Sequence, residues 1–309
     1  MLAIVLLHHY LGNGLSIAEL MQKVATTPVN LPRPSLPARS RGMRILLTAL
    51  MPIRIFYDTA DSLIENYCGT HLWTKIRKIK KYYTAFTNPI PVEVTKKVKN
   101  MHGVSFLSVS LASISGAMHR VMTDVGHHVP ERIKIAFTIP NPKQPEGMYN
   151  TTFFTFTFLP IEKNSTPENL KRISNKLAEL KLSFDTLGYG LLIKCISLLP
   201  IRVGRFLKRG FATAVISSFP VLEENGQLDN IDVTDVISTI GPCNSGCGII
   251  VLMCGVAGNQ RISVSIDKSL IANEQQFLKI GPYIEEEIMH LYNLGLKDGM
   301  GSDKKLDLC

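Results

Sequence analysis

The run Leu2-Ala-Ile-Val-Leu-Leu7 and the motif that follows it, His8-His9-Tyr-Leu-Gly-Asn13-Gly14, decide the predicted fold. A continuous apolar run of this length predicts a strand that is buried on both faces. The glycines of the motif permit a tight turn. Ser16 and Glu19 then have the spacing of a capping box, ahead of apolar residues at helical spacing. The sequence therefore predicts a strand, a glycine-containing turn and a helix, with the histidine pair at the end of the strand.

The composition limits the classes of protein that remain. The chain has 309 residues, a net charge of +9, 45% hydrophobic residues and 19% charged residues, and its mean hydropathy is +0.13. These values exclude a largely disordered chain and indicate apolar substrates or contact with a membrane surface. No apolar run reaches the roughly 18 residues of a transmembrane helix, and Met1–Leu7 lacks the basic start of a signal peptide.

Two stretches in the first third of the chain allow alternative interpretations. Residues 26–42 contain four prolines and predict an extended connector, and Pro52 is expected to interrupt any helix in the apolar stretch 43–66. Residues 43–57 fit either an interfacial segment or a buried core segment. Residues 75–99 hold eight Lys or Arg against one acid, which suits anionic lipid head groups, the phosphates of CoA or a solvated linker between two halves. A nucleic-acid partner is not expected, because the stretch contains no recognisable module.

The rest of the chain predicts alternating strands and helices. Strands are expected at residues 133–139, 151–159, 212–219, 230–239, 248–256 and 261–267, and helices at residues 105–122, 167–184, 191–208 and 273–294. The resulting fold class is α/β or α+β, with a mixed sheet flanked by helices. The six cysteines have no metal-site or disulfide spacing, so no metal site is expected and the thiols are expected to be reduced.

The histidine pair is the strongest candidate for chemistry. A histidine fixed by a glycine-containing turn has a pKa near working pH, which suits a general base for a hydroxyl or thiol. Neighbouring residues of a strand point to opposite faces, so one ring can enter a cleft while the other packs inward. A buried, purely structural pair is the competing interpretation. The pair His127-His128 has no such turn and is interpreted as part of a solvated loop.

The motif resembles the His-His-x-x-x-Asp-Gly motif of the wax ester synthase/diacylglycerol acyltransferase family, within the CoA-dependent acyltransferase superfamily. Three later regions resemble the family in the same order. The segments 129–136 and 150–160 resemble a strand pair, Thr213–Pro220 resembles the Ser-Asn-x-Pro-Gly-Pro segment, and residues 246–267 resemble a glycine-led hairpin. The resemblance runs from residue 1 to about residue 295.

The resemblance implies an O-acyltransferase that uses acyl-CoA as co-substrate and no cofactor. The acceptor would be diacylglycerol or a long-chain alcohol, and His9 would be the general base. His8 and Asn13 would be mainly structural, while Gly14, Ser217 and Ser218 would line a substrate channel between two similar domains. The location implied is a membrane surface facing the cytosol, at the plasma membrane or the endoplasmic reticulum.

The chain also departs from the family pattern. Asn13 stands for the usual Asp, Leu107-Ser108 for Asn-Asp, Ser218 for Asn and Val221-Leu222 for Gly-Pro. We expect residues 1–90 to be the remnant of a first domain and residues 95–300 to be a complete C-terminal domain. The alternative function is therefore a catalytically inactive acyl- or lipid-binding protein of the same fold.

Overall fold

The computed structural model describes residues 3–8, 11–26, 39–68, 81–141, 144–183, 198, 200, 212–224, 226–241 and 247–306. Its centre is a seven-stranded mixed sheet in the order β1-β9-β8-β5-β3-β4, with β2 paired to β9. The strands are β1 (Tyr82–Phe86), β2 (Ile90–Pro91), β3 (Arg132–Pro140), β4 (Thr152–Pro160), β5 (Ala214–Val221), β8 (Ile249–Val256) and β9 (Asn259–Asp267). The pairs β3–β5 and β5–β8 are parallel and the other pairs are antiparallel. The expected fold class is confirmed.

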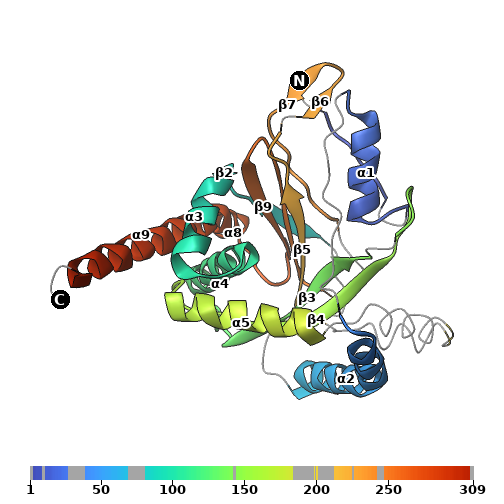
Figure 1. Ribbon diagram of the computed structural model, residues 1–309, viewed down its shortest axis with the longest axis horizontal. Helices are drawn as coiled ribbons and strands as arrows, with labels where there is room; N and C mark the ends of the chain where they lie inside the picture. Colours follow the sequence, from blue (N-terminus) through green and yellow to red (C-terminus); the bar gives the residue numbers. More distant parts are fainter. Residues whose placement is uncertain are drawn as a thin grey trace.

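A layer of helices covers one face of this sheet (Figure 1). The layer consists of α3 (Val92–His102), α4 (Phe106–Asp124), α5 (Pro167–Ser183), α8 (Glu274–Leu278) and α9 (Ile280–Leu306). Helix α4 is the central one, and its side chains from Ser108 to Met118 are all buried. Apolar residues of alternate strand positions, such as Ile135, Ile216 and Val251, pack against it in the main core. The predicted helices 105–122, 167–184 and 273–294 are confirmed, with a break at Lys279 in the last.

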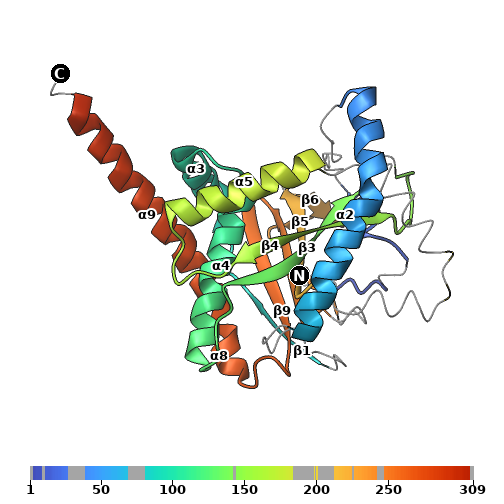
Figure 2. The same cartoon turned by 90° about the horizontal axis from the view of Figure 1, so that it is seen from below.

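The second face of the sheet carries the N-terminal part of the chain. In Figures 1 and 2, α4 and α9 lie on one side of the sheet, and α2 (Arg41–Cys68) lies on the other. Helix α1 (Gly14–Val24) is beside the small hairpin of β6 (Gly226–Leu228) and β7 (Ile231–Val233). The backbone N–H of Thr26 donates to Gln227 O at 2.7 Å, which ties the end of α1 to that hairpin.

The structure corrects three expectations for the N-terminal region. Residues 3–8 form no strand, and Ile4 and Leu6 are 84% and 94% exposed, because no strand in the described part of the chain pairs with them. The N-cap of α1 is Asn13, whose Oδ1 accepts from Ser16 N, so Ser16 lies inside the first turn and does not cap it. Helix α2 continues through Pro52, because neighbouring turns keep their hydrogen bonds although proline donates none.

Two further expectations need correction in the C-terminal part. The predicted strand 230–239 is limited to Ile231–Val233, because side chains rather than a ladder hold the following residues. Arg261 makes a bidentate ion pair with Asp235 and thereby lowers the pKa of that carboxyl group. The supposed linker 75–99 contains β1, β2 and most of α3, which are parts of the sheet and its helix layer. The predicted helix 191–208 lies outside the described residues, apart from residues 198 and 200.

The close approach of α9 to the end of β1 generates the first prediction. A Cβ atom at Gly281 would lie 2.5 Å from the backbone oxygen of Phe86, whereas one at Gly42 in α2 would meet nothing within 4 Å. We expect Gly281→Ala to lower the free energy of unfolding by about 1–3 kcal/mol through overpacking. Gly42→Ala is the matched control and should be neutral or stabilising by up to about 1 kcal/mol. Urea unfolding followed by circular dichroism measures both, and equal midpoints for the two variants would contradict the packing described.

Candidate active site

The turn of the histidine motif is fixed by its own backbone and by Asn13. The N–H of Leu11 donates to His8 O at 2.9 Å, which closes the turn. Asn13 is 2% exposed and caps α1 through its Oδ1 atom, which accepts from Ser16 N at 3.1 Å. His8 is exposed, and His9 lies outside the described residues. The motif thus leads directly into α1, whose first residue is Gly14.

Asn13 forms a reciprocal amide pair with Gln144, which lies in the loop between β3 and β4. Its Nδ2 donates to Gln144 Oε1 at 2.6 Å, and Gln144 Nε2 donates back to Asn13 Oδ1 at 3.2 Å. Gln144 is 4% exposed. Both members are uncharged, so a neutral pair occupies the position where the Asp of the motif would place a charge. Neutral hydrogen bonds are roughly half as strong as charge-assisted ones.

Other polar groups extend this pair into a buried network that we call the polar clamp, made of Asn13, Ser16, Gln144, the backbone of Tyr149, and Thr151. Ser16 Oγ donates to Tyr149 O at 2.9 Å and accepts from Gln144 Nε2 and Tyr149 N at 2.8 and 3.0 Å. Thr151 Oγ1 donates to Gln144 Oε1 at 2.7 Å, and Asn13 N donates to Tyr149 O at 2.9 Å. The clamp attaches the histidine turn to the loop that connects two strands of the main sheet.

An aromatic contact gives the turn a second attachment. The ring of Phe219, near the end of β5, lies so close to Gly14 that an added Cβ would be 2.1 Å from its Cζ atom. Because Gly14 has no side chain, the ring of Phe219 can approach its backbone closely. The motif turn and strand β5 are far apart in the sequence but in contact in the fold.

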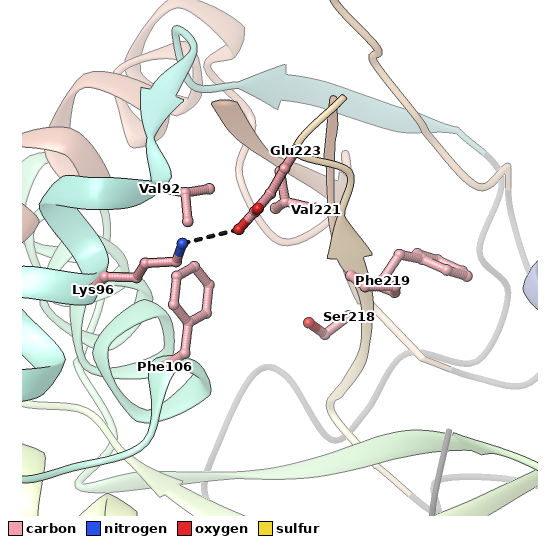
Figure 3. Close-up of a pocket in the computed structure, with 8 residues that line it drawn as sticks. Val92, Lys96, Phe106, Ser218, Phe219, Val221 and Glu223 are labelled. Atoms are coloured by element: carbon pink, nitrogen blue, oxygen red, sulfur yellow. Dashed lines mark hydrogen bonds and ion pairs between the residues drawn. The ribbon is translucent and has the colours of Figure 1, made fainter. Parts of the chain in front are cut away.

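A cavity of about 270 Å³ opens on the other side of the same strand end. It is lined by Val92, Lys96, Phe106, Ser218, Phe219, Pro220, Val221 and Glu223. In Figure 3 the side chain of Ser218 lies on the side of Phe106 and Lys96, and the ring of Phe219 points away from them. The cavity and the histidine turn are thus separated by one strand.

One ion-pair cluster borders this cavity. Lys96 Nζ lies 2.9 Å from Glu93 Oε1 and 3.1 Å from Glu223 Oε1. The hydrogen bond to Glu93, which has the larger effect, and the one to Glu223 raise the pKa of Lys96. All three side chains are exposed, so the pair with Glu223 contributes little to stability. It does connect α3 to the segment that follows β5, across the cavity.

The two predicted serines lie on opposite faces of the sheet. Ser218 lines the cavity. Ser217 is 8% exposed and accepts a hydrogen bond of 2.9 Å from Thr138 Oγ1 of β3, on the face that carries α1 and α2. Among the predicted site residues that the structure describes, Asn13 belongs to the polar clamp and Gly14 contacts Phe219. Ser218 lies on the other face of the strand, where it lines the cavity.

Sequence reasoning missed Gln144, Phe219 and Lys96. Gln144 lies in a proline-containing loop without periodicity, so nothing in the sequence marks it. Phe219 lies inside the segment Thr213–Pro220, and the family resemblance of this segment is the signal in the sequence that could have identified it. Lys96 is one of eight Lys or Arg in the basic stretch 75–99, and the sequence does not distinguish it from the others. Within the described ranges, no three His, Cys, Asp or Glu side chains gather as a metal site would require.

The comparisons with known proteins agree with this geometry. Residues 149–291 match the model of the WS/DGAT C-terminal domain family, which confirms over these residues the resemblance noted in the sequence. The matched region begins at Tyr149, the residue whose backbone belongs to the polar clamp. Among curated protein sequences, none matches this chain at a significant level.

Solved structures with the same fold include one enzyme of this family. The wax ester synthase/diacylglycerol acyltransferase from Marinobacter aquaeolei VT8 is similar with a TM-score of 0.57 and 9% identity, over 93% of this chain and 66% of that chain. The epimerization domain from the third module of tyrocidine synthetase B follows, with a TM-score of 0.53, 12% identity and coverage of 94% and 68%. The first condensation domain of the CDA synthetase has a TM-score of 0.52, 13% identity and coverage of 93% and 62%. The chain thus spans just under two thirds of the wax ester synthase, and the likeness at these identities shows the fold.

The neutral amide pair predicts a pH-dependent defect in Asn13→Asp. The new carboxylate would face Gln144 Oε1 without the N–H that now donates to it, so burial and repulsion would raise its folded-state pKa above the unfolded value of about 3.9. A raised acid pKa means that stability is retained below about pH 4 and lost as the pH rises towards neutrality. We expect a deficit of about 2 kcal/mol or more at pH 7.

Urea unfolding of the wild type and Asn13→Asp at pH 4, 5.5 and 7 measures this deficit. Asn164→Asp is the matched control, because Asn164 is exposed and its substitution should cost little at any pH. A deficit for Asn13→Asp that is independent of pH would contradict the assignment of a buried, uncharged site.

The contact between Gly14 and Phe219 predicts strong coupling between substitutions at the two positions. Gly14→Ala should displace the ring and loosen α1, at a cost of about 1–3 kcal/mol. The same substitution in a Phe219→Ala background should cost almost nothing, because the obstructing ring is gone. Hydrogen–deuterium exchange of the α1 amides measures the local effect. Equal increases in exchange from Gly14→Ala in both backgrounds would show that the ring does not seat the turn.

Proposed function

We propose that this chain transfers a fatty acyl group from acyl-CoA to a hydroxyl group, because residues 149–291 match the WS/DGAT C-terminal domain model and the chain is similar in fold to a wax ester synthase/diacylglycerol acyltransferase. The proposed acceptor is a diacylglycerol or a long-chain alcohol, so that the product is a triacylglycerol or a wax ester. Acyl-CoA is the co-substrate, and the proposed reaction uses no cofactor.

His9 is the proposed general base. Its imidazole takes the proton of the acceptor hydroxyl while that oxygen attacks the thioester carbonyl carbon. The tetrahedral intermediate collapses with cleavage of the C–S bond, and the imidazolium returns the proton to the leaving CoA thiolate. Atoms and charge balance without an oxidant or a metal. His8 and Asn13 have structural roles in this proposal, holding the turn that carries the base.

The observation that carries the proposal is the attachment of the histidine turn to the family domain. Asn13 and Ser16 bond to Tyr149, the first residue of the matched region, and Gly14 contacts Phe219 within that region. Two independent contacts thus hold the start of α1, one at the loop between β3 and β4 and the other at the end of β5. A general base needs such fixed placement, because misplacement by about 1 Å costs roughly 100-fold in rate.

The cavity behind Phe219 is the proposed site for an apolar part of a substrate. Val92, Phe106 and Val221 provide an apolar lining, and Ser218 provides one hydroxyl group. Small-molecule sites commonly combine apolar walls with a few polar groups. Ser218 and Gly14 are the residues of the implied channel that lie on the two sides of the strand end.

The neutral partner of Asn13 supports a second candidate, an acyl- or lipid-binding protein without turnover. In this case the fold binds acyl-CoA, but the histidine turn does not promote transfer. The two candidates differ in one measurable property, because both bind acyl-CoA but only the enzyme forms an ester.

The test of the proposal is His9→Ala in the full chain. Loss of a general base should lower the rate of ester formation about 100- to 10,000-fold, with acyl-CoA binding retained. Ester product from palmitoyl-CoA and either hexadecanol or dioleoylglycerol is measured by chromatography, together with binding of palmitoyl-CoA. His128→Ala is the matched control, because His128 is exposed and lies in the loop between α4 and β3. Undiminished transfer by His9→Ala would overturn the role of His9, and binding without any ester formation by the wild type would favour the second candidate.

A further inference from the structure

The apolar residues of helix α2 follow a heptad pattern. They recur at alternating intervals of three and four positions, at Met43, Leu46, Leu50, Ile53, Tyr57, Ala60 and Ile64. In an α-helix this alternation places them in one narrow stripe, the a and d positions of a coiled coil. Six of the seven are between 47% and 68% exposed, and Ala60 is half-buried. We call these seven residues the α2 seam.

The α2 seam faces away from the rest of the protein. Among the described side chains of α2, Met51 is the buried one, and Thr48 is half-buried one turn before it. Thr48 and Met51 occupy the f and b positions of the same heptads, which lie on the side opposite a and d. Figure 1 shows α2 at the edge of the molecule. Helix α2 therefore contacts the protein with one side and exposes the seam on the other.

A second helix with the same repeat fits this seam. Scattered exposed apolar side chains need no partner, but a continuous apolar stripe marks an interaction surface. An a and d pattern that persists over three heptads or more is typical of a coiled coil. The 28 residues of α2 give a contact up to about 42 Å long, at 1.5 Å per residue. Pro52 does not interfere, because it occupies a c position outside the seam.

The charges of α2 point to a second copy of the same helix in antiparallel orientation. The two halves of the helix carry opposite charges, the basic residues Arg41, Arg44 and Arg54 being followed by the acidic residues Asp58, Asp61 and Glu65. An antiparallel copy places the basic half of each helix along the acidic half of the other, whereas a parallel copy would place like charges together. Arg41 and Arg44 lie on the side of Thr48, so they set the direction of the pair across its width, and the seam provides the affinity.

The antiparallel orientation also brings the seam into register with itself. When the two helices are aligned at their centres, the layers pair Ile53 with Tyr57, Leu50 with Ala60 and Leu46 with Ile64 of the other copy. Each layer joins one a residue to one d residue. Every contact then occurs twice, as the two-fold symmetry of a homodimer requires.

We propose that two copies of this chain associate through α2 in an antiparallel two-helix coiled coil. This inference goes beyond the proposed acyl transfer and does not depend on it. The seam includes no residue of the histidine motif, the polar clamp or the cavity, so His9→Ala should dimerise like the wild type whether or not the chain is an enzyme.

Sedimentation equilibrium of the full chain tests the inference. The wild type should be dimeric at tens of micromolar and dissociate on dilution. Leu46→Glu with Ile53→Glu should raise the dissociation constant of the dimer at least about 100-fold, because four apolar side chains of the contact become carboxylates. Arg41→Glu with Arg44→Glu should raise it about tenfold, because these positions would then repel the acidic half of the other copy.

Each variant has a matched control elsewhere on the surface. Leu278→Glu with Met289→Glu makes the same apolar-to-acidic change at residues that are each 46% exposed, and Lys97→Glu with Lys171→Glu reverses two exposed charges on α3 and α5. Both should dimerise like the wild type, and circular dichroism confirms that all variants remain folded.

Three outcomes would overturn the proposal. A wild type that stays monomeric at tens of micromolar, or a dimer that Leu46→Glu with Ile53→Glu leaves intact, would show that the seam is not the contact. Association that Arg41→Glu with Arg44→Glu leaves unchanged or strengthens would contradict the antiparallel orientation.

Discussion

Strand β5 determines where the candidate site lies, because consecutive residues of a strand point to opposite faces of a sheet. Ala214 and Ile216 face the helix layer and belong to the core. The same alternation carries Ser218 towards the cavity beside α3 and α4, and Phe219 towards Gly14 on the other face. The register with β8 shifts between Ser218 and Val221, so the regular pairing is interrupted there before it resumes at Val221. A single strand end thus provides one wall of the cavity and the seat of the histidine turn.

The polar clamp makes the position of the histidine turn insensitive to pH. Asn13, Ser16, Gln144 and Thr151 contribute only amide and hydroxyl groups, and these do not ionise in the range in which a histidine titrates. An acidic residue at position 13 would need a cation or several donors to remain buried. With Gln144 opposite it, the amide satisfies both groups at once and leaves neither unpaired. The exchange of Asp for Asn therefore changes the chemistry of the attachment but preserves its geometry.

The sequence predicted the C-terminal part well and the N-terminal part poorly, and the difference has a physical cause. Strands such as Thr152–Pro160 and the helix at Phe106 combine strong local propensity with burial in the main core, so pattern and packing agree. The run 2–7 has the same apolar signal, but a strand also needs a neighbouring strand, and sequence alone does not show whether one is present. For the site, the motif marked Asn13 and Gly14, whereas Gln144 is recognisable only when the fold brings the β3–β4 loop against the turn. Partners that are about 130 residues apart leave no local signal.

Two apolar helices illustrate why hydropathy alone does not assign a role. Helix α4 is buried on nearly all sides, and two of its buried serines donate to backbone carbonyls, Ser113 to Val109 and Ser115 to Pro160. Helix α2 is also rich in Leu, Ile and Met, but most of its described apolar side chains are exposed, whereas Met51 is buried. Some apolar residues of the chain thus form the core and stabilise the fold, whereas others form an apolar surface that is exposed to water. Burial of apolar surface is favourable at roughly 25 cal/mol per Å², so what separates the two helices is the apolar area that each removes from water and not their composition.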